Sequence, residues 1–181
     1  INNVGTNDWK PTAKYTSTEL STLLSTNFES AYHFSQLAYP LLKASGHGSI
    51  VFVSSVAGVF SINVGSIYGS TKAGAVNQLT KELACEWAKD NIRTNCVAPW
   101  FVRTPLTEQV LSSSKFMEAV VSRTPLGRVG EPEEVAHLGF ANGVSSPLHD
   151  INPRFYKPYH EIIHSRFRVN FCESYLHEDA W

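Results

Sequence analysis

The strongest constraint on the fold is an alternation of short strand-like runs with long amphipathic segments. Residues 49–54 form an almost wholly apolar run after a glycine, which is typical of a strand buried on both faces of a parallel sheet. A second strand is expected at 92–98, where Pro99 ends it, and residues 1–6 have the sequence of a strand that runs into a turn. Because helical segments separate these strands, the sequence predicts an α/β fold with a parallel sheet.

Two long helices are predicted between the strands. The first begins at a capping box, in which Glu19 follows Thr16 by three residues, and it ends near Gly46. Its apolar residues recur in steps of three and four: Leu20, Leu23, Leu24, Phe28, Ala31, Phe34, Ala38, Leu41 and Leu42. The second is predicted at about 67–90, with a buried stripe formed by Val76, Leu79, Leu83 and Trp87. Further helices are expected around 106–121 and from Glu131 onward.

Size and composition exclude several classes of protein. The 181 residues suffice for one domain with a core, and 15 Lys+Arg against 16 Asp+Glu leave a net charge of −1. That balance gives no reason to expect nucleic acid or an anionic membrane surface as a partner. No apolar run approaches the roughly 20 residues of a membrane-spanning helix. The three cysteines are too few for a disulfide scaffold, so a reducing compartment, the cytoplasm, is the expected location.

The two ends of the sequence suggest a piece of a longer protein. The only methionine is Met117, the chain opens on Ile1, and its first residues do not resemble a targeting peptide. From about Gly139 the α/β pattern stops, and histidines, prolines and aromatic residues follow without periodicity. We therefore expect an α/β part over 1–139 and a divergent, poorly ordered tail over 140–181.

One motif in the tail has the spacing of zinc ligands. His160-Glu161-Ile162-Ile163-His164 would place two histidines on one face of a helix beside a glutamate base. A third ligand is missing, because the positions where a known continuation requires Gly and His hold Phe167 and Asn170. Segments rich in histidine produce such matches by chance, so no metal site is predicted.

Tyr68 and Lys72 form the most informative pair of side chains. They stand four residues apart near the start of the second helix and therefore share one face. A free tyrosine has a pKa near 10, and an ammonium nearby lowers that pKa by stabilising the phenolate. Tyr68 could then act as a general acid/base on a carbonyl/alcohol pair. Ser55 follows the apolar strand, where ligands bind in open α/β sheets, and could hold the substrate oxygen.

Each of these features also has a simpler interpretation. A Tyr/Lys pair at this spacing often occurs on helix surfaces without any function. Cys85 and Cys96 are predicted to pack rather than to act as nucleophiles. Trp87 and the apolar residues of the first helix are predicted to lie in the core or to face a second copy of the chain.

Several motifs, taken together and in order, resemble the short-chain dehydrogenases/reductases. Ser55, Tyr68 and Lys72 match the catalytic set of that family, and Asn2-Asn3-Val4-Gly5 is similar to its Asn-Asn-Ala-Gly turn. The stretch 93–99, followed by Thr104, resembles the strand and loop that meet the nicotinamide. The amino-acid sequences of segments 28–33, 86–93 and 125–132 are similar to those of the plant tropinone-reductase-like branch. The resemblance covers residues 1 to about 138.

The resemblance implies NADPH-dependent reduction of a ketone. Ser55 would orient the carbonyl, Tyr68 would donate the proton, and Lys72 would lower the tyrosine pKa and hold the nicotinamide ribose. Asn27 would support a proton relay through water, and Thr104 with the Val102 backbone would hold the carboxamide. The residues it implies around the cofactor are Asn3, Gly5, Tyr68, Lys72, Pro99, Val102 and Thr104. The family also implies a homo-oligomer in the full-length parent.

The sequence departs from the family in three places. The glycine-rich phosphate loop is missing, because Gly46-His47-Gly48 lacks a third glycine and precedes a strand instead of following one. Pro99-Trp100 replaces the Pro-Gly of the general family, so Trp100 is expected to shape the substrate pocket. The tail lacks the last strand with its Asp-Gly-Gly end.

The fold expected from the residues and the resemblance is a partial Rossmann-type, doubly wound parallel sheet. It would lack the N-terminal βα units and the last strand. The expected function is NADPH-dependent reduction of a small ketone to an alcohol, with the isolated chain inactive. The alternative is a truncated, non-catalytic protein that associates with full-length relatives through the helices at 16–45 and 67–90.

Overall fold

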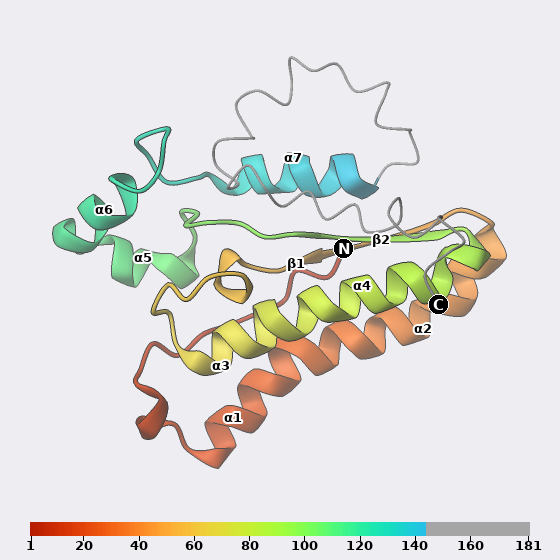
Figure 1. The fold of residues 1–181 in the computed structure, drawn as a ribbon, viewed down its shortest axis with the longest axis horizontal. Helices are drawn as coiled ribbons and strands as arrows, with labels where there is room; N and C mark the ends of the chain where they lie inside the picture. Colours follow the sequence, from red (N-terminus) through yellow and green to blue (C-terminus); the bar gives the residue numbers. More distant parts are fainter. Residues whose placement is uncertain (144–181) are drawn as a thin grey trace, which may run out of the picture.

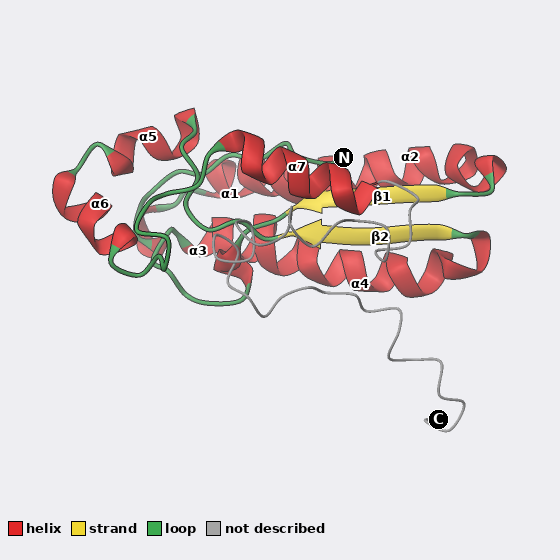
Figure 2. Cartoon of the chain, turned by 90° about the horizontal axis from the view of Figure 1, so that it is seen from above, coloured by secondary structure: helices red, strands yellow, loops and turns green. Residues whose placement is uncertain are grey.

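The computed structural model of the chain describes residues 1–143 and contains the expected parallel sheet. Strands β1 (Gly48–Val53) and β2 (Ile92–Val97) pair in parallel, with Gly48 opposite Ile92 and Val53 opposite Val97. Both arrows point the same way in Figure 2. The strand expected at 1–6 is reduced to one bridge on the other edge of β1, where the Asn2 amide donates to the Val51 carbonyl at 2.8 Å. The α/β class is confirmed.

The first predicted helix is continuous but contains a π-turn. It consists of α1 (Ser17–Leu24), a π-turn over Ser25–Glu29 and α2 (Ser30–Ser45). The capping box is present, since the Glu19 amide donates to the Thr16 hydroxyl and the Thr16 amide donates to the Glu19 carboxylate. Gly46 ends the helix at φ +74°, a left-handed conformation that glycine adopts without strain.

The second predicted helix has the same construction. Helix α3 (Ser66–Tyr68) leads through a π-turn over Gly69–Ala75 into α4 (Val76–Trp87), and one 3-10 turn follows. All four residues of the predicted stripe are buried: Val76, Leu79, Leu83 and Trp87. The position of this helix is therefore confirmed, whereas neither π-turn was predicted.

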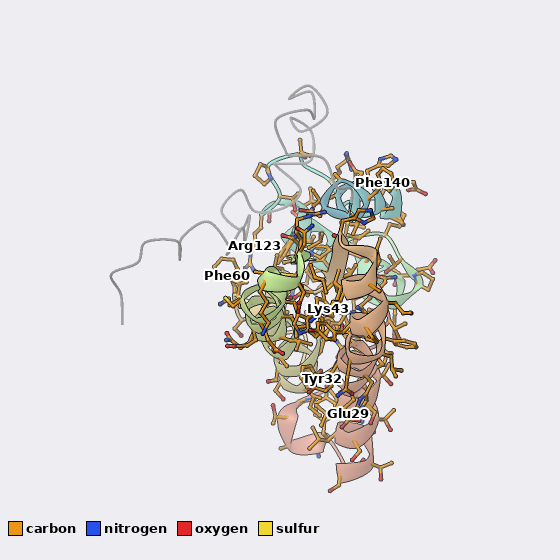
Figure 3. The ribbon with its side chains drawn as sticks, turned by 90° about the vertical axis from the view of Figure 1, so that its right-hand side faces the viewer. Glu29, Tyr32, Lys43, Phe60, Arg123 and Phe140 are labelled. Atoms are coloured by element: carbon orange, nitrogen blue, oxygen red, sulfur yellow. The ribbon has the colours of Figure 1, made fainter. Side chains whose placement is uncertain are left out.

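Helices cover both faces of the small sheet. In Figure 1, α2 and α4 lie side by side along one face, and α7 (Pro132–Gly143) lies along the other. The core between α2, α4 and the sheet is built around the fully buried Phe52, and it includes Ala31, Ile50, Val76, Leu83, Trp87 and Ile92. Tyr32 on α2 and Phe140 on α7 mark the two outer layers in Figure 3.

The single helix predicted around 106–121 is two helices. Helix α5 (Pro105–Leu111) and α6 (Ser114–Val121) are separated at Ser112 and Ser113, and the Ser113 backbone is extended. Serine favours helix ends because its hydroxyl competes for nearby backbone groups. The two helices enclose a second core, made of Val64, Phe101, Leu111, Val120 and Val129.

The apolar residues of the first helix, which were expected to lie in the core or to face a second copy of the chain, are divided between buried and exposed positions. Leu23 and Ala31 are buried, but Leu20, Phe34 and Leu41 are exposed, and Leu37 beside them is 70 % exposed. The apolar residues occupy two faces of this helix, and only one face meets the sheet. Within residues 1–143, an exposed apolar strip of Phe34, Leu37 and Leu41 therefore runs along α2.

Two findings concern the rest of the chain. Helix α7 continues to Gly143, past the composition change predicted at Gly139. The tail segment and its histidine motif lie outside the described residues, so those predictions stay predictions. No helix within residues 1–143 has the length and apolarity to span a membrane.

Candidate active site

A cavity of about 480 Å³ opens at the carboxyl ends of the two strands. This is the edge of a parallel α/β sheet where ligands bind, because the loops that leave the strands diverge there. Eight of the nine residues singled out from the sequence line it: Asn3, Gly5, Ser55, Tyr68, Lys72, Pro99, Val102 and Thr104. The ninth, Asn27, lies behind the cavity wall.

The turn after β1 fixes Ser55. The Ser54 amide donates to the Val97 carbonyl at 2.8 Å, and the Ser55 hydroxyl accepts from the Ala57 amide at 3.2 Å. Gly58 brings this turn against the second helix, since a Cβ there would lie 2.4 Å from the Ala73 Cβ. The serine is thus held at a short, fixed separation from the helix that carries Tyr68.

Tyr68 faces the cavity in a largely apolar surrounding. Burial raises the pKa of its phenol, and a hydrogen bond with the Ser55 side chain opposes this increase. Lys72 is not among the groups that shift this pKa. The lowering of the Tyr68 pKa that was expected from Lys72 is therefore not seen, because the lysine gives its hydrogen bonds to main-chain carbonyls. In this structure Tyr68 is a protonated phenol, ready to donate.

Lys72 is a buried ammonium held by the N-terminal segment. Its Nζ donates to the Asn3 carbonyl at 3.0 Å and to the Val4 carbonyl at 2.6 Å. Gly5 gives the side chain room, since a Cβ at position 5 would lie 2.7 Å from the Lys72 Cε. Burial lowers the pKa of Lys72 to about 8. The Lys72 ammonium and the Tyr68 phenol are therefore two titratable groups that line the same cavity.

The lowered pKa of Lys72 predicts a pH dependence of stability. The unfolded lysine titrates near 10.5 and the folded one near 8, so between these values the unfolded state binds more protons. The free energy of unfolding of the wild type, relative to Lys72→Met, should rise by about 2 kcal/mol from pH 8 to pH 10. Urea unfolding at both pH values measures it. Lys43→Met is the control, because the hydrogen bond with Asp90 raises the pKa of that exposed lysine instead of lowering it; an equal rise for both variants would contradict the prediction.

Asn27 uses its side chain for structure. It is fully buried, its Oδ1 accepts from the Thr6 amide at 2.8 Å, and its Nδ2 donates to the Thr6 carbonyl at 2.9 Å. The same Nδ2 also donates to the Thr71 hydroxyl at 3.2 Å. The amide is thus fully engaged away from the cavity, and the relay role that the resemblance implies stays a prediction.

The far side of the cavity is formed by the segment after β2. Val102 pairs with Gly130 in a parallel bridge, the Val102 carbonyl accepts from the Thr107 hydroxyl, and the Thr104 amide donates to that hydroxyl at 3.2 Å. Among the described residues, the cavity is lined by one cationic side chain, that of Lys72, and by several hydroxyl and carbonyl groups, and none of its lining side chains is acidic. Such donors fit the ribose and carboxamide of a nicotinamide nucleotide, and Gly5 leaves the approach to Lys72 open.

An apolar wall adjoins Tyr68 and was only partly predicted. A small cavity of about 50 Å³ beside Ser55 and Tyr68 is lined by Trp9, Ile62, Val64, Trp100, Phe101 and Leu106, among others. Trp100, which was expected to shape a pocket, lines both cavities. Trp9 was missed, because it stands in a loop without periodicity; its ring packs edge-on against Phe116 at 6.5 Å.

The rest of the described residues provide no second candidate for a catalytic or metal site. A cavity of about 910 Å³ lies between the loops at 9–12 and 57–66, but its one cation, Lys10, is already paired with Asp8 and Glu19. Within residues 1–143 no three His, Cys, Asp or Glu side chains are grouped so that they could hold a metal ion.

Known proteins match most of this chain. Residues 1–141 match the family described as Enoyl-(Acyl carrier protein) reductase. A tropinone reductase homologue of Arabidopsis thaliana is 68 % identical over 138 residues, which are 76 % of this chain and 52 % of that protein. Senescence-associated protein 13 of the same plant is 59 % identical over 138 residues, or 76 % and 51 % of the two chains. The chain spans about half the length of these curated relatives.

Solved structures share the fold. A gluconate 5-dehydrogenase from Burkholderia cenocepacia, in complex with NADP and tartrate, has a TM-score of 0.74 and 26 % identity, covering 79 % of this chain and 57 % of that one. An oxidoreductase of the short-chain dehydrogenase/reductase family from Burkholderia thailandensis has a TM-score of 0.73 and 28 % identity, covering 80 % and 56 %.

Proposed function

The chain belongs to the short-chain dehydrogenase/reductase family, in its plant tropinone-reductase-like branch, and from this premise we propose that it carries the proton-donating site of an NADPH-dependent ketone reductase. The observation that carries the proposal is the convergence of Ser55, Tyr68 and Lys72 on one cavity at the strand ends. Ser55 follows β1, whereas Tyr68 and Lys72 lie four residues apart on the next helix, so the meeting of the serine with this pair is a property of the fold.

Each side chain has a role that its surroundings support. The Ser55 hydroxyl orients the substrate carbonyl beside the phenol, and Tyr68 gives its proton to the carbonyl oxygen as that oxygen becomes an alcohol. Lys72 contributes as a cation on the cavity wall, since its ammonium is held by the Asn3 and Val4 carbonyls and does not shift the pKa of Tyr68. The nicotinamide supplies the hydride that the carbonyl carbon accepts.

The cofactor would lie along the polar side of the cavity. Lys72 would hold its ribose, and Thr104 with the Val102 backbone would hold its carboxamide. NADP is the proposed form, supported by the solved neighbour in complex with NADP. These 181 residues contain no glycine-rich phosphate loop, so we propose that the chain alone binds NADPH weakly.

The substrate we propose is a small, uncharged ketone with an apolar ring. The wall beside Tyr68 is aromatic and aliphatic, and within residues 1–143 the side chains that line the two cavities next to Tyr68 include no Asp or Glu. A ketone that carries an ammonium group would therefore lose its hydration without gaining a counter-ion. Trp9 and Trp100 would offer ring faces to an apolar substrate instead.

A second candidate function is supported by the apolar strip on α2. Phe34, Leu37 and Leu41 lie on one face of α2 and are exposed among the described residues, and exposed apolar surface of this kind marks protein contacts. The strip would join copies of this chain, or this chain and longer relatives, into oligomers. A chain that only associates in this way would be non-catalytic.

One set of measurements separates the two functions. The 181-residue chain is compared with a chimaera in which its residues 1–138 replace the matched stretch of the Arabidopsis homologue that is 68 % identical. We expect the chimaera to oxidise NADPH in the presence of cyclohexanone-type ketones, as measured by the loss of absorbance at 340 nm. We expect the isolated chain to cause no change in nicotinamide fluorescence when NADPH is titrated into it. A chimaera that binds NADPH but reduces no ketone would refute the reductase. Light scattering that shows larger species of the isolated chain, with no catalysis by the chimaera, would support the second function.

A further inference from the structure

Two π-turns face each other behind the cavity. One spans Ser25–Glu29 and holds Asn27, and the other spans Gly69–Ala75 and holds Thr71 and Lys72. The two segments are in contact. π-turns are rare, and where they occur they are often found at functional sites, because they change the direction of a side chain without ending the helix.

The Thr71 hydroxyl links the two turns. It is buried, it donates to the Ile67 carbonyl at 2.7 Å, and it accepts from the Asn27 Nδ2 at 3.2 Å. The first bond is an ordinary local one, since threonine in a helix often bonds the carbonyl four residues before it. The second reaches across 44 residues of sequence, so it joins two elements.

From Asn27 the connection continues to Lys72. The Asn27 amide bonds both the amide and the carbonyl of Thr6, as a neighbouring strand would. Thr6 follows the segment whose Asn3 and Val4 carbonyls hold the Lys72 ammonium. Because Lys72 follows Thr71 directly, these contacts close a ring that begins and ends on the same helix.

We propose that Thr71 is a positioning residue: through Asn27 and the backbone of residues 3–6, its hydroxyl fixes where the Lys72 ammonium lies in the cavity. Gly5 makes the ring possible, because the lysine stem passes where a Cβ would stand. The importance of that position for the reaction rests on the proposed function, whereas the position itself does not.

Thr80 provides a matched control. It lies farther along the same continuous helix and is as buried as Thr71. Its hydroxyl likewise donates to the carbonyl four residues earlier, that of Val76, at 2.8 Å. It has no bond to Asn27. A Thr→Val substitution at either site removes the local bond and keeps the shape of the side chain, and at position 80 it also removes a hydrogen bond with the Cys96 side chain. Only Thr71→Val opens the ring.

The first experiment measures Lys72 directly in the 181-residue chain. Acetylation by acetic anhydride is followed by mass spectrometry from pH 6 to 11. Among the described side chains that line the cavity, Tyr68 is the only other titratable one, so the labelling midpoint reports the surroundings of Lys72. In Thr71→Val we expect the midpoint to move upward, toward that of an exposed lysine, and the labelling rate to increase. In Thr71→Ser and Thr80→Val it should stay at the wild-type value.

The second experiment uses the chimaera defined above. Thr71→Val should lower kcat about tenfold and displace its pH profile, because small displacements of a positioned group have large effects on rate. Thr71→Ser should restore both, and Thr80→Val should leave the profile unchanged. Equal labelling midpoints in Thr71→Val, Thr80→Val and the wild type overturn the positioning role even if no ketone is reduced. A wild-type chimaera without activity refutes the proposed function instead.

Discussion

Replacing Tyr68 by phenylalanine should lower kcat for ketone reduction about 10²- to 10⁴-fold, the usual effect of losing a positioned general acid. Phenylalanine fills the same apolar space, but it has no proton to give to the developing alkoxide. Lys72 would not substitute, because its ammonium is engaged by the carbonyls of Asn3 and Val4. The NADPH oxidation rate of the chimaera at saturating ketone measures the effect, and the KM for NADPH should change little.

Tyr32→Phe is the matched control for this substitution. Tyr32 is exposed on α2, so removing its hydroxyl should leave kcat within twofold of the wild type. If Tyr68→Phe retained a tenth or more of the wild-type rate, another group would have to supply the proton, and the assignment of Tyr68 would be withdrawn.

The largest loss of stability is expected for Phe52→Ala. Phe52 is 0 % exposed, and it packs in the core that joins β1 to α2 and α4. Truncating a fully buried phenylalanine removes its transfer free energy and leaves a cavity, which together cost about 3–5 kcal/mol. Urea unfolding followed by circular dichroism measures the change in the free energy of unfolding.

Phe140→Ala tests whether that loss comes from burial. Phe140 lies on α7 at the outside of the molecule (Figure 3). It is 69 % exposed, so its removal should change the free energy of unfolding by less than about 0.5 kcal/mol. Similar losses for the two variants would mean that Phe52 does not occupy the core of the folded chain.

Local chemistry explains what the sequence could predict. The capping box at Thr16 and the left-handed Gly46 are determined by a few adjacent residues, and both bounds of the first helix followed from them. The apolar run of β1 and the buried stripe of α4 have clear periods. Ser55 followed from its position at a strand end, and Tyr68 and Lys72 from their helical spacing, whereas the other cavity residues followed from the resemblance to a known family.

What the sequence did not predict depends on contacts between distant segments. A π-turn shifts the register of a helix by one residue and leaves no periodic signal, so the two turns at Asn27 and Lys72 were not expected. The exposure of Phe34 and Leu41 depends on which face of α2 meets the sheet. Trp9 contributes to the substrate wall only because its loop folds back onto α6. The engagement of Lys72 by the Asn3 and Val4 carbonyls spans almost 70 residues.

The order in which the chain can fold follows from its parallel sheet. Gly48 pairs with Ile92 only after the intervening helix has formed and crossed over. The chain therefore loses the entropy of closing that long loop before strand pairing contributes any stabilising free energy. The bond from Lys72 to Asn3 closes a still longer loop. Helical structure should therefore be detectable early in refolding, whereas the cavity should form only in the last, slowest phase. A partly folded chain would have its helices but no place for a ligand.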